Sequence, residues 1–178
     1  MAPPGDAPLV PGLPYRVAVL CYLRDPAGRL LLLHRRKPPN LDLYSPIGGK
    51  LETSRGESPT ACAVREVREE SGLDLTMDRL RAIGVVSEAA FEGSGHWLMF
   101  LFDCDLDADE ADQVVTDRCV TDEGRLAWFT PEAMDGLALP ETDRLVINPL
   151  VHRHASDQRF FMAHIDCSSE KLRWQQEQ

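Results

Sequence analysis

The sequence has no run of 18 consecutive apolar residues, so it indicates no membrane-spanning helix. Its N-terminus lacks the basic and then apolar pattern of a secretory signal, which makes a cytoplasmic location the expectation. There are five cysteines, and no two of them form a Cys-x-x-Cys pair. An odd and dispersed set is typical of reduced thiols and argues against a disulfide framework or a zinc site. We therefore interpret Cys62 as a small core residue.

Positive charge is scarce, because 19 lysines and arginines face 29 aspartates and glutamates and leave a net charge of −10. Such a charge repels polynucleotide backbones, so neither long nucleic acid nor a membrane is an expected partner. A small phosphorylated substrate is compatible with it if metal ions and a few cationic side chains mediate the contact. With 43% hydrophobic and 27% charged residues, the 178-residue chain has the composition of one globular domain.

The distribution of prolines and apolar runs suggests how the chain is organised. Residues 1–14 hold five of the thirteen prolines and are predicted to be a flexible arm, whereas 15–178 are predicted to form a single domain. The acidic residues 105–112 are expected to be a loop, and about 138–178 to be a helix-strand-helix extension. Its parts are a helix at 140–147 that Pro149 ends, an edge strand at 160–165 and a terminal helix at 168–178. Further strands are predicted at 15–23, 29–34, 80–87, 96–105 and 125–129.

The stretch from residue 48 to residue 73 combines a glycine turn, a polar loop and a helix with clear ends. Ser58 is a suitable N-cap, Pro59 fits the first helical position, and Gly72 suits the left-handed position beyond the last turn. These signals predict a helix over 59–71.

Three carboxylates, Glu66, Glu69 and Glu70, stand at i, i+3 and i+4 on this helix and share one face. Like charges at this spacing destabilise a helix, and the helix dipole disfavours anions in its C-terminal half. A cation is therefore expected among them, and hard carboxylate ligands select Mg²⁺, Mn²⁺ or Ca²⁺ over zinc. The alternative is a solvated acidic face on which Arg65 and Arg68 are the partners.

The context of the three carboxylates resembles the motif of the Nudix hydrolases. Residues 65–73 match the Arg-Glu-apolar-x-Glu-Glu-x-Gly-apolar helix of that family position by position, and Glu57 precedes Arg65 with seven residues between them, as in the family. The pair Gly48 and Gly49 resembles the start of the same motif. One departure is the loop of seven residues between Gly49 and Glu57, where the family usually has five. We expect a bulged loop with both ends in their usual places.

The resemblance implies an α/β fold, a Nudix-type α/β/α sandwich with a mixed central sheet. It also implies divalent-metal-dependent hydrolysis of a nucleoside diphosphate linked to another group, with Mg²⁺ or Mn²⁺ as the cofactor and a small nucleotide-diphosphate as the substrate. Arg65 should pair with Glu57 and pin the loop to the helix. In this reading the ions are held by Glu66, Glu69, Glu70 and the Gly49 carbonyl. The proton of the attacking water is taken by one of these carboxylates or by a loop acid, Asp122 or Glu123. The phosphates are contacted by Arg35, Arg36 and Lys50.

Substrate identity stays open at this point. The motif favours nucleoside triphosphates, including oxidised ones, which would give monophosphate and pyrophosphate, and the alternatives are ADP-ribose and dinucleotide polyphosphates. A nucleotide-sensing, non-catalytic module is the alternative of another class, and isomerisation of an isoprenoid diphosphate lacks a clear cysteine and acid pair. Neither Trp97, interpreted as a core residue, nor Asn148 selects a base. By analogy with many relatives, a homodimer is the expected assembly.

Overall fold

The computed structural model describes residues 14–93, 95–116 and 119–178. The predicted flexible arm lies outside these residues except for Pro14, whose carbonyl oxygen accepts the N–H of His96 at 2.9 Å. No helix of the described part is long and apolar enough to cross a bilayer. The strands are β1 (Tyr15–Arg24), β2 (Leu30–Arg35), β3 (Tyr44–Pro46), β4 (Arg81–Phe91), β5 (Gly95–Asp105), β6 (Cys119–Thr121), β7 (Gly124–Phe129), β8 (Phe161–Asp166) and β9 (Arg173–Gln176). The helices are α1 (Pro59–Ser71), α2 (Ala108–Gln113), α3 (Pro131–Met134) and α4 (Asn148–Asp157), with short turns η1 (Thr53–Arg55), η2 (Met77–Arg79) and the π-helical η3 (Asp143–Ile147).

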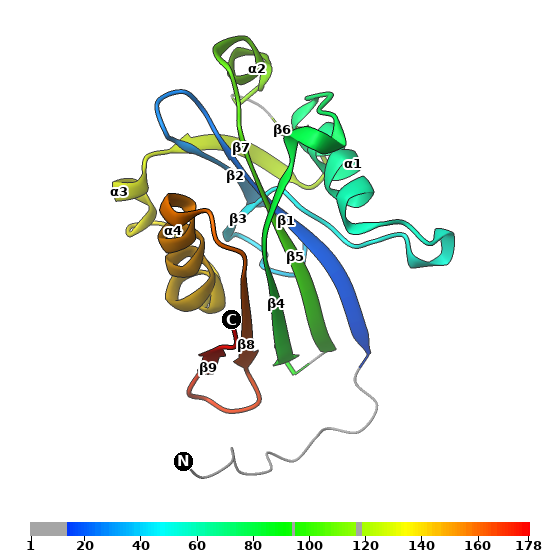
Figure 1. Cartoon of the computed structure of the whole chain (residues 1–178), viewed down its shortest axis with the longest axis vertical. Helices are drawn as coiled ribbons and strands as arrows, with labels where there is room; N and C mark the ends of the chain where they lie inside the picture. Colours follow the sequence, from blue (N-terminus) through cyan, green and yellow to red (C-terminus); the bar gives the residue numbers. More distant parts are fainter. Residues whose placement is uncertain (1–13, 94, 117–118) are drawn as a thin grey trace.

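The described strands form one mixed sheet in the order β6-β7-β2-β1-β5-β4-β8-β9, with β3 paired to β2 (Figure 1). The pairs β1 with β5 and β4 with β8 are parallel, and the others are antiparallel. Strand β5 lies inside the sheet, as its apolar residues on both faces predict. The leucine run of β2 is likewise covered on both faces, since Leu31, Leu32 and Leu33 are all buried.

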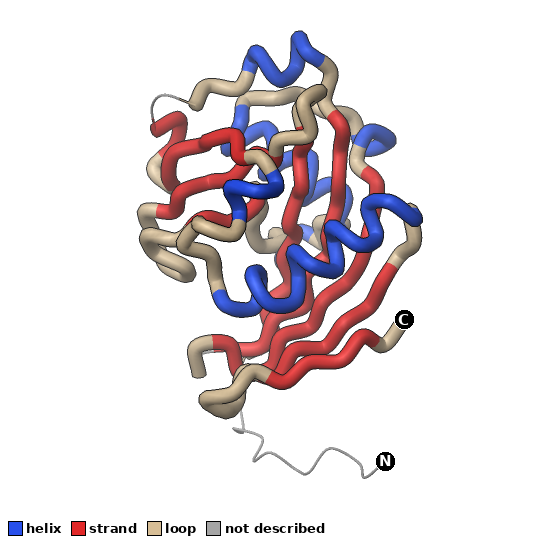
Figure 2. The backbone as a smooth tube through the Cα atoms, turned by 90° about the vertical axis from the view of Figure 1, so that its left-hand side faces the viewer, coloured by secondary structure: helices blue, strands red, loops and turns tan. Residues whose placement is uncertain are grey.

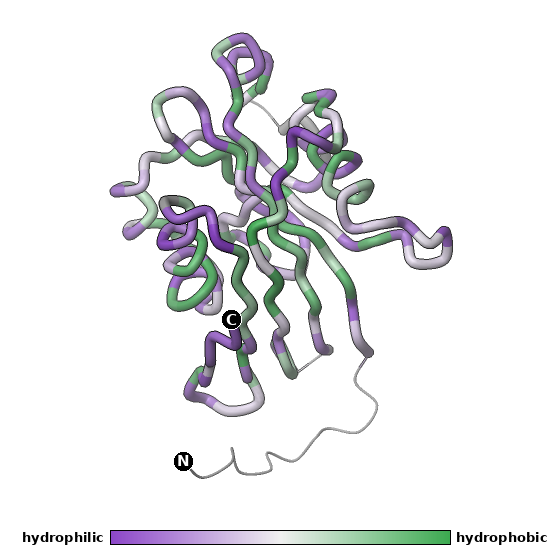
Figure 3. The backbone as a smooth tube through the Cα atoms, viewed as in Figure 1, coloured by the Kyte–Doolittle hydropathy of each residue, from purple (hydrophilic) through white to green (hydrophobic). Residues whose placement is uncertain are grey.

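Alternate side chains of β1 build two cores on opposite faces of the sheet. Val19, Cys21 and Leu23 pack with α1, whereas Ala18 and Tyr22 pack with the side that α4 covers. Figure 2 shows α4 crossing the face of the sheet, and Figure 3 shows hydrophobic residues along the central strands and a hydrophilic α2. The predicted α/β/α sandwich with a mixed central sheet is confirmed.

The prediction of a loop over 105–112 is wrong, because most of this segment is the helix α2. Asp107 accepts the N–H of Glu110, and the Glu110 side chain accepts the N–H of Asp107, which makes a capping box. Reading the run of acids as a solvated loop overlooked this spacing of three residues.

Three predictions for the C-terminal part are also wrong. Pro149 does not end a helix, because η3 runs directly into α4; the wider π-helical turn leaves room for the proline ring. The terminal helix is instead the strand β9, which pairs antiparallel with β8. As a result β8 lies between β4 and β9 and is not an edge strand. The free backbone groups of β8 override the helix propensity of this polar segment.

Candidate functional site

Helix α1 forms over the residues that the sequence predicts. The Ser58 hydroxyl accepts the N–H of Ala61 at 3.2 Å, Pro59 occupies the first turn, and Gly72 ends the helix at a φ of 80°. Cys62 is fully buried in the core that α1 shares with Val19, Cys21 and Leu23 of β1, which confirms its interpretation as a core residue.

The three carboxylates of α1 differ in burial. The side chain of Glu66 is 12% exposed and that of Glu69 is 58% exposed, while Glu70 as a residue is only 3% exposed. Glu66 and Glu70 are one turn apart and both contact the Gly48–Gly49 turn, so they form the inner part of the site. Glu69 lies at its solvent-exposed rim.

The glycine turn is held against β1 and leaves no space for side chains. The N–H of Val19 donates to the Gly49 carbonyl oxygen at 2.9 Å. A Cβ on Gly48 would lie 2.1 Å from the Val19 carbonyl oxygen, and one on Gly49 would lie 2.2 Å from a carboxylate oxygen of Glu66. The N–H of Gly48 donates to Oε2 of Glu70 at 3.3 Å. Glycine is therefore needed at both positions for backbone and carboxylates to approach this closely; the role of the Gly49 carbonyl as a metal ligand stays a prediction.

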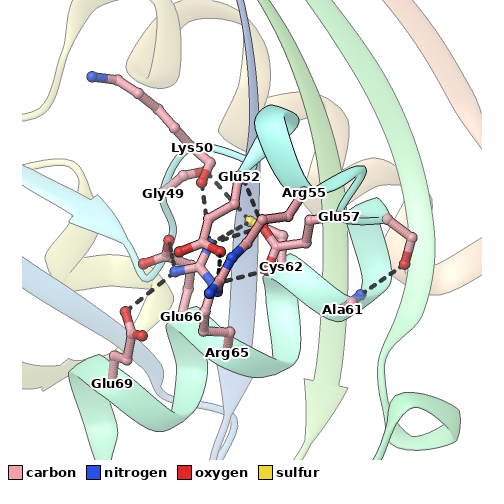
Figure 4. A network of polar contacts seen from close by, with 11 residues as sticks. Gly49, Lys50, Glu52, Arg55, Glu57, Ala61, Cys62, Arg65, Glu66 and Glu69 are labelled. Carbon is pink, nitrogen blue, oxygen red and sulfur yellow. Dashed lines mark hydrogen bonds and ion pairs between the residues drawn. The ribbon is translucent and has the colours of Figure 1, made fainter.

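Arg65 joins the loop to the helix, as predicted. Its Nε and Nη2 donate to the two carboxylate oxygens of Glu57 at 2.8 and 3.0 Å, and Nη2 also reaches the carbonyl oxygen of Lys50 at 3.2 Å. Its Nη1 donates to Glu66 at 2.7 Å and to Glu69 at 3.2 Å. Figure 4 shows Arg65 between Glu57 and Glu66, with the ammonium group of Lys50 pointing away from these three side chains. These bonds hold the pKa of Glu57 down at about 2.

The loop that is longer than usual folds locally and keeps its ends in place. Residues Thr53–Arg55 form the turn η1, and Gly56 follows in the left-handed conformation at a φ of 66°. The N–H of Glu52 donates to Glu57 at 2.8 Å, which closes the loop onto the carboxylate that Arg65 holds. The extra length is thus absorbed before Glu57 in a locally folded loop. That both ends lie where the family usually has them stays a prediction.

The carboxylate and carbonyl oxygens of this site are the ligands that a hard divalent cation prefers, although the carboxylates do not point at one common position. Among the described residues, no three His, Cys, Asp or Glu side chains lie in an arrangement that could hold a metal ion, and Nη1 of Arg65 donates to both Glu66 and Glu69. The buried Oε1 of Glu70 has no hydrogen-bond partner in the described part. Burial, followed by the charges of Glu66 and Glu123, raises the pKa of Glu70 to about 8. A buried carboxylate oxygen without a partner, beside further carboxylates, is what an oxygen-seeking cation would satisfy.

The two candidate loop acids are placed differently. Glu123 is half-buried, lines the same cavity as Glu66, and raises the pKa values of both Glu66 and Glu70 through its charge. The side chain of Asp122 is 96% exposed and lies 3.8 Å from Lys37. The geometry thus favours Glu123 over Asp122 as the loop acid of the site.

The three residues that were predicted to bind phosphate also differ in their positions relative to the site. Arg35 lines the cavity, donates from Nε to the carbonyl oxygen of Pro39 at 2.8 Å, and lowers the pKa of Glu70 through its charge. Lys50 lines the cavity as well, with its ammonium nitrogen 5.8 Å from the ring centroid of Trp97. Arg36 contributes its backbone N–H to the Glu123 carbonyl oxygen at 2.8 Å. Arg35 and Lys50 therefore stand at the site, while the Arg36 backbone helps to position the loop acid.

A cavity of about 420 Å³ connects these groups to a second set of residues that our sequence analysis missed as binding residues. Ser45, Glu88 and Asp143 line it together with Trp97, and all four are buried. Glu88 could have been noticed, because it alternates with the apolar residues Val86 and Ala90, which are buried on the same side of β4.

Residues 14–152 match the family model described as the NUDIX domain. The chain belongs to the NUDIX family. The match extends from β1 into α4, so the described parts of the NUDIX motif and the cavity lie within it. The resemblance inferred from residues 48–73 is confirmed.

Among curated proteins, dihydroneopterin triphosphate diphosphatase of Escherichia coli (strain K12) is 32% identical over 83 residues, which cover 47% of this NUDIX chain and 52% of that protein. The protein of the same name from Shigella flexneri gives the same values. The chain thus spans about half the length of the curated relatives it matches.

Solved structures agree with the fold of this NUDIX chain. A MutT protein from Methanosarcina mazei Go1 has a TM-score of 0.62 and 25% identity, over 83% of this chain and 97% of that chain. The NUDIX domain of Shewanella oneidensis NrtR, in complex with ADP ribose, has a TM-score of 0.64 and 14% identity, over 79% and 88% of the two chains. A bifunctional NMN adenylyltransferase/ADP ribose pyrophosphatase of Francisella tularensis, in complex with AMP and a Mn ion, has a TM-score of 0.62 and 18% identity, over 81% and 43%.

Replacing Arg65 with methionine should destabilise the chain by about 1–3 kcal/mol, because several hydrogen bonds to charged groups are lost. The low pKa of Glu57 contributes stability that is complete above its ordinary value of 4.5 and is lost as the pH falls towards about 2. The difference from wild type in urea unfolding, measured in EDTA, should therefore shrink between pH 4.5 and pH 2. Arg68→Met, at an exposed position of the same helix, is the matched control and should change little. A pH-independent difference would contradict this assignment of Glu57.

Proposed function

We propose that this chain is a divalent-metal-dependent hydrolase of diphosphate bonds in small organic triphosphates, with Mg²⁺ or Mn²⁺ as the ion. The single observation that carries the proposal is the buried Oε1 of Glu70, which has no partner in the described part and is acted on by the charges of Glu66 and Glu123, two residues that line the cavity. A metal held by Glu66, Glu69, Glu70 and the Gly49 carbonyl would neutralise phosphate charge and lower the pKa of a bound water.

The side chains around this position have separate tasks in the proposed reaction. Arg35 and Lys50 balance the charge of the phosphates, since both line the cavity and Arg35 acts electrostatically on Glu70. Glu123 accepts the proton of the attacking water, because it lines the same cavity as Glu66 and its charge acts on Glu66 and Glu70. Water then bonds to one phosphorus, and the bridging oxygen leaves with the other phosphate group. Arg65 keeps Glu66 and Glu69 in position through Nη1.

For the substrate we propose a triphosphate attached to a heterocyclic ring system, cleaved to a monophosphate and pyrophosphate. Nucleoside triphosphates, oxidised ones included, are consistent with the motif, and the curated relatives are named for dihydroneopterin triphosphate. ADP-ribose and dinucleotide polyphosphates are the alternatives, and a non-catalytic sensor would bind nucleotide without turnover.

A hydrolysis screen with product identification tests the proposal. Nucleoside triphosphates, dihydroneopterin triphosphate, ADP-ribose and diadenosine tetraphosphate are incubated with Mg²⁺ or Mn²⁺, and products are identified by phosphorus NMR. We expect pyrophosphate from at least one triphosphate, no product in EDTA, and a loss of about 10²-fold or more in Glu69→Gln. Glu132→Gln, at an exposed position of α3, should act like wild type. Equal rates for Glu69→Gln and wild type, or no turnover of any compound, would refute the hydrolase.

A further inference from the structure

The cavity contains buried polar atoms that the proposed hydrolysis does not use. Oε1 of Glu88, Nε1 of Trp97 and Oγ of Ser45 have no hydrogen-bond partner in the described part, and the three residues are 4%, 7% and 5% exposed. All three residues line the cavity that Glu66 also lines. Buried polar atoms without partners are costly in a folded protein, so several at one cavity indicate a ligand that supplies the missing bonds.

These groups sit on rigid elements rather than on loops. Glu88 and Trp97 are directly paired across β4 and β5, so their side chains are on the same face of the sheet. Thr142 lowers the pKa of Glu88, and both Thr142 and the next residue, Asp143, line the cavity too. We call Ser45, Glu88, Trp97 and Asp143 the ring pocket.

The rest of the lining suits a flat ring. Ala18, Leu20, Phe91 and Met99 supply apolar surface to the same cavity. An apolar cleft with a few polar atoms at fixed positions is the usual form of a site that orients a heterocycle.

The polar atoms have a definite hydrogen-bonding character. The unpartnered Oε1 of Glu88 accepts when the carboxylate is ionised, which is its state above about pH 7, and the indole N–H of Trp97 can only donate. The complementary ligand edge therefore has neighbouring N–H and NH₂ donors next to a carbonyl acceptor. Guanine and the reduced pterins share that edge, whereas adenine lacks the carbonyl and has a ring nitrogen that accepts.

We propose that the ring pocket binds the substrate ring through this edge and so selects 2-amino-4-oxo heterocycles, with Glu88 accepting from the ring donors and Trp97 donating to the ring carbonyl. This inference rests on the proposed function for its substrate class, since it places the triphosphate of the same molecule at Glu66 and Glu70. To the proposed function this inference adds the chemical class of the ring and the residues that bind it.

Binding of analogues that cannot be cleaved tests the ring pocket separately from turnover. The α,β-methylene analogues of GTP, ITP and ATP are titrated calorimetrically into the full chain with Mg²⁺. We expect the GTP analogue to bind at least about tenfold more tightly than the ITP analogue, which lacks the 2-amino group, or the ATP analogue. Glu88→Gln should weaken the GTP analogue by about 10-fold to 100-fold and the ATP analogue by less than about threefold. Glu132→Gln is the surface control.

A second variant covers the case in which Glu88→Gln does not fold, as judged by circular dichroism. Trp97→Phe keeps an aromatic ring but removes the N–H, and should weaken the GTP and ITP analogues by about tenfold while leaving the ATP analogue unchanged. The ratio of kcat/KM for GTP and dihydroneopterin triphosphate then distinguishes a guanine from a pterin as the ring.

Equal affinity for the three analogues, or equal weakening of all three by Glu88→Gln or Trp97→Phe, would overturn the ring pocket. Hydrolysis of several triphosphates without such selectivity would refute this inference alone. Selective binding without hydrolysis of any triphosphate would support it and refute the proposed hydrolase.

Discussion

Replacing Glu70 with glutamine is expected to lower kcat by about 10²-fold to 10⁴-fold at saturating Mg²⁺. Glu70 is the most deeply buried of the three α1 carboxylates, and its Oε1 has no partner in the described part. A neutral amide can still accept the N–H of Gly48, so the fold should be kept. The amide supplies no negative charge to a cation, however, and its NH₂ group cannot act as a metal ligand.

Thermal unfolding with and without Mg²⁺ gives a second readout for the same variant. A ligand present at 100 times its Kd stabilises a folded protein by about 2.7 kcal/mol, so wild type should show a clear rise in Tm. Glu70→Gln should show little or none, while Glu132→Gln should respond like wild type. A Glu70→Gln variant with kcat within threefold of wild type and an unchanged Mg²⁺ response would exclude Glu70 as a metal ligand.

Replacing Asp143 with asparagine should stabilise the chain at alkaline pH by an amount on the order of a few kcal/mol. Burial, followed by the nearby charge of Glu88, raises the pKa of Asp143 to about 8, and burial raises that of Glu88 to about 7. Other titratable groups near Asp143 are Tyr22, whose pKa Asp143 raises, and Lys50, which lines the same cavity.

The sign of the pH effect follows from proton binding. In the unfolded chain Asp143 titrates near 3.8, so between that value and about 8 the folded state holds more protons. The free energy of unfolding should therefore be highest below about pH 4 and fall as the pH rises to about 8. Guanidinium unfolding of wild type and Asp143→Asn between pH 4 and pH 9, without metal, measures this. The two curves should agree near pH 4, separate progressively as the pH rises to about 8 and run parallel above it; curves that are parallel from pH 4 upward would contradict the raised pKa.

The part of the site that depends on local sequence could be predicted before the structure was known. The caps at Ser58 and Gly72 and the three carboxylates lie within one short segment, and their spacing fixes their geometry because an α-helix and its caps impose it. The pairing of Arg65 with Glu57 was predicted from the resemblance to the Nudix motif. The sandwich could be predicted for a similar reason, since continuous apolar runs alternate with capped helices along the chain.

The ring pocket could not be predicted, because it depends on contacts between distant parts of the chain. Glu88 becomes a cavity residue only when β4 pairs with β5 and η3 brings Asp143 over the same face. The strand β9 shows the same limit, since its conformation is set by the free edge of β8 and not by its own composition. Periodicity indicates which face of an element is buried, but not which partner covers it.

Strand β1 runs between the two ends of the cavity and so fixes the distance between them. Val19 holds Gly49 through a backbone hydrogen bond, and Arg16, three residues earlier, is the registered partner of Trp97. Three strand residues span roughly 10 Å. In the proposed function, this strand segment sets the distance between the ring pocket and the carboxylates of α1, so a substrate with a longer spacer would present a different phosphate to Glu66 and Glu70. The proposed site would then select substrates by length through its backbone, independently of any side chain that contacts the ring.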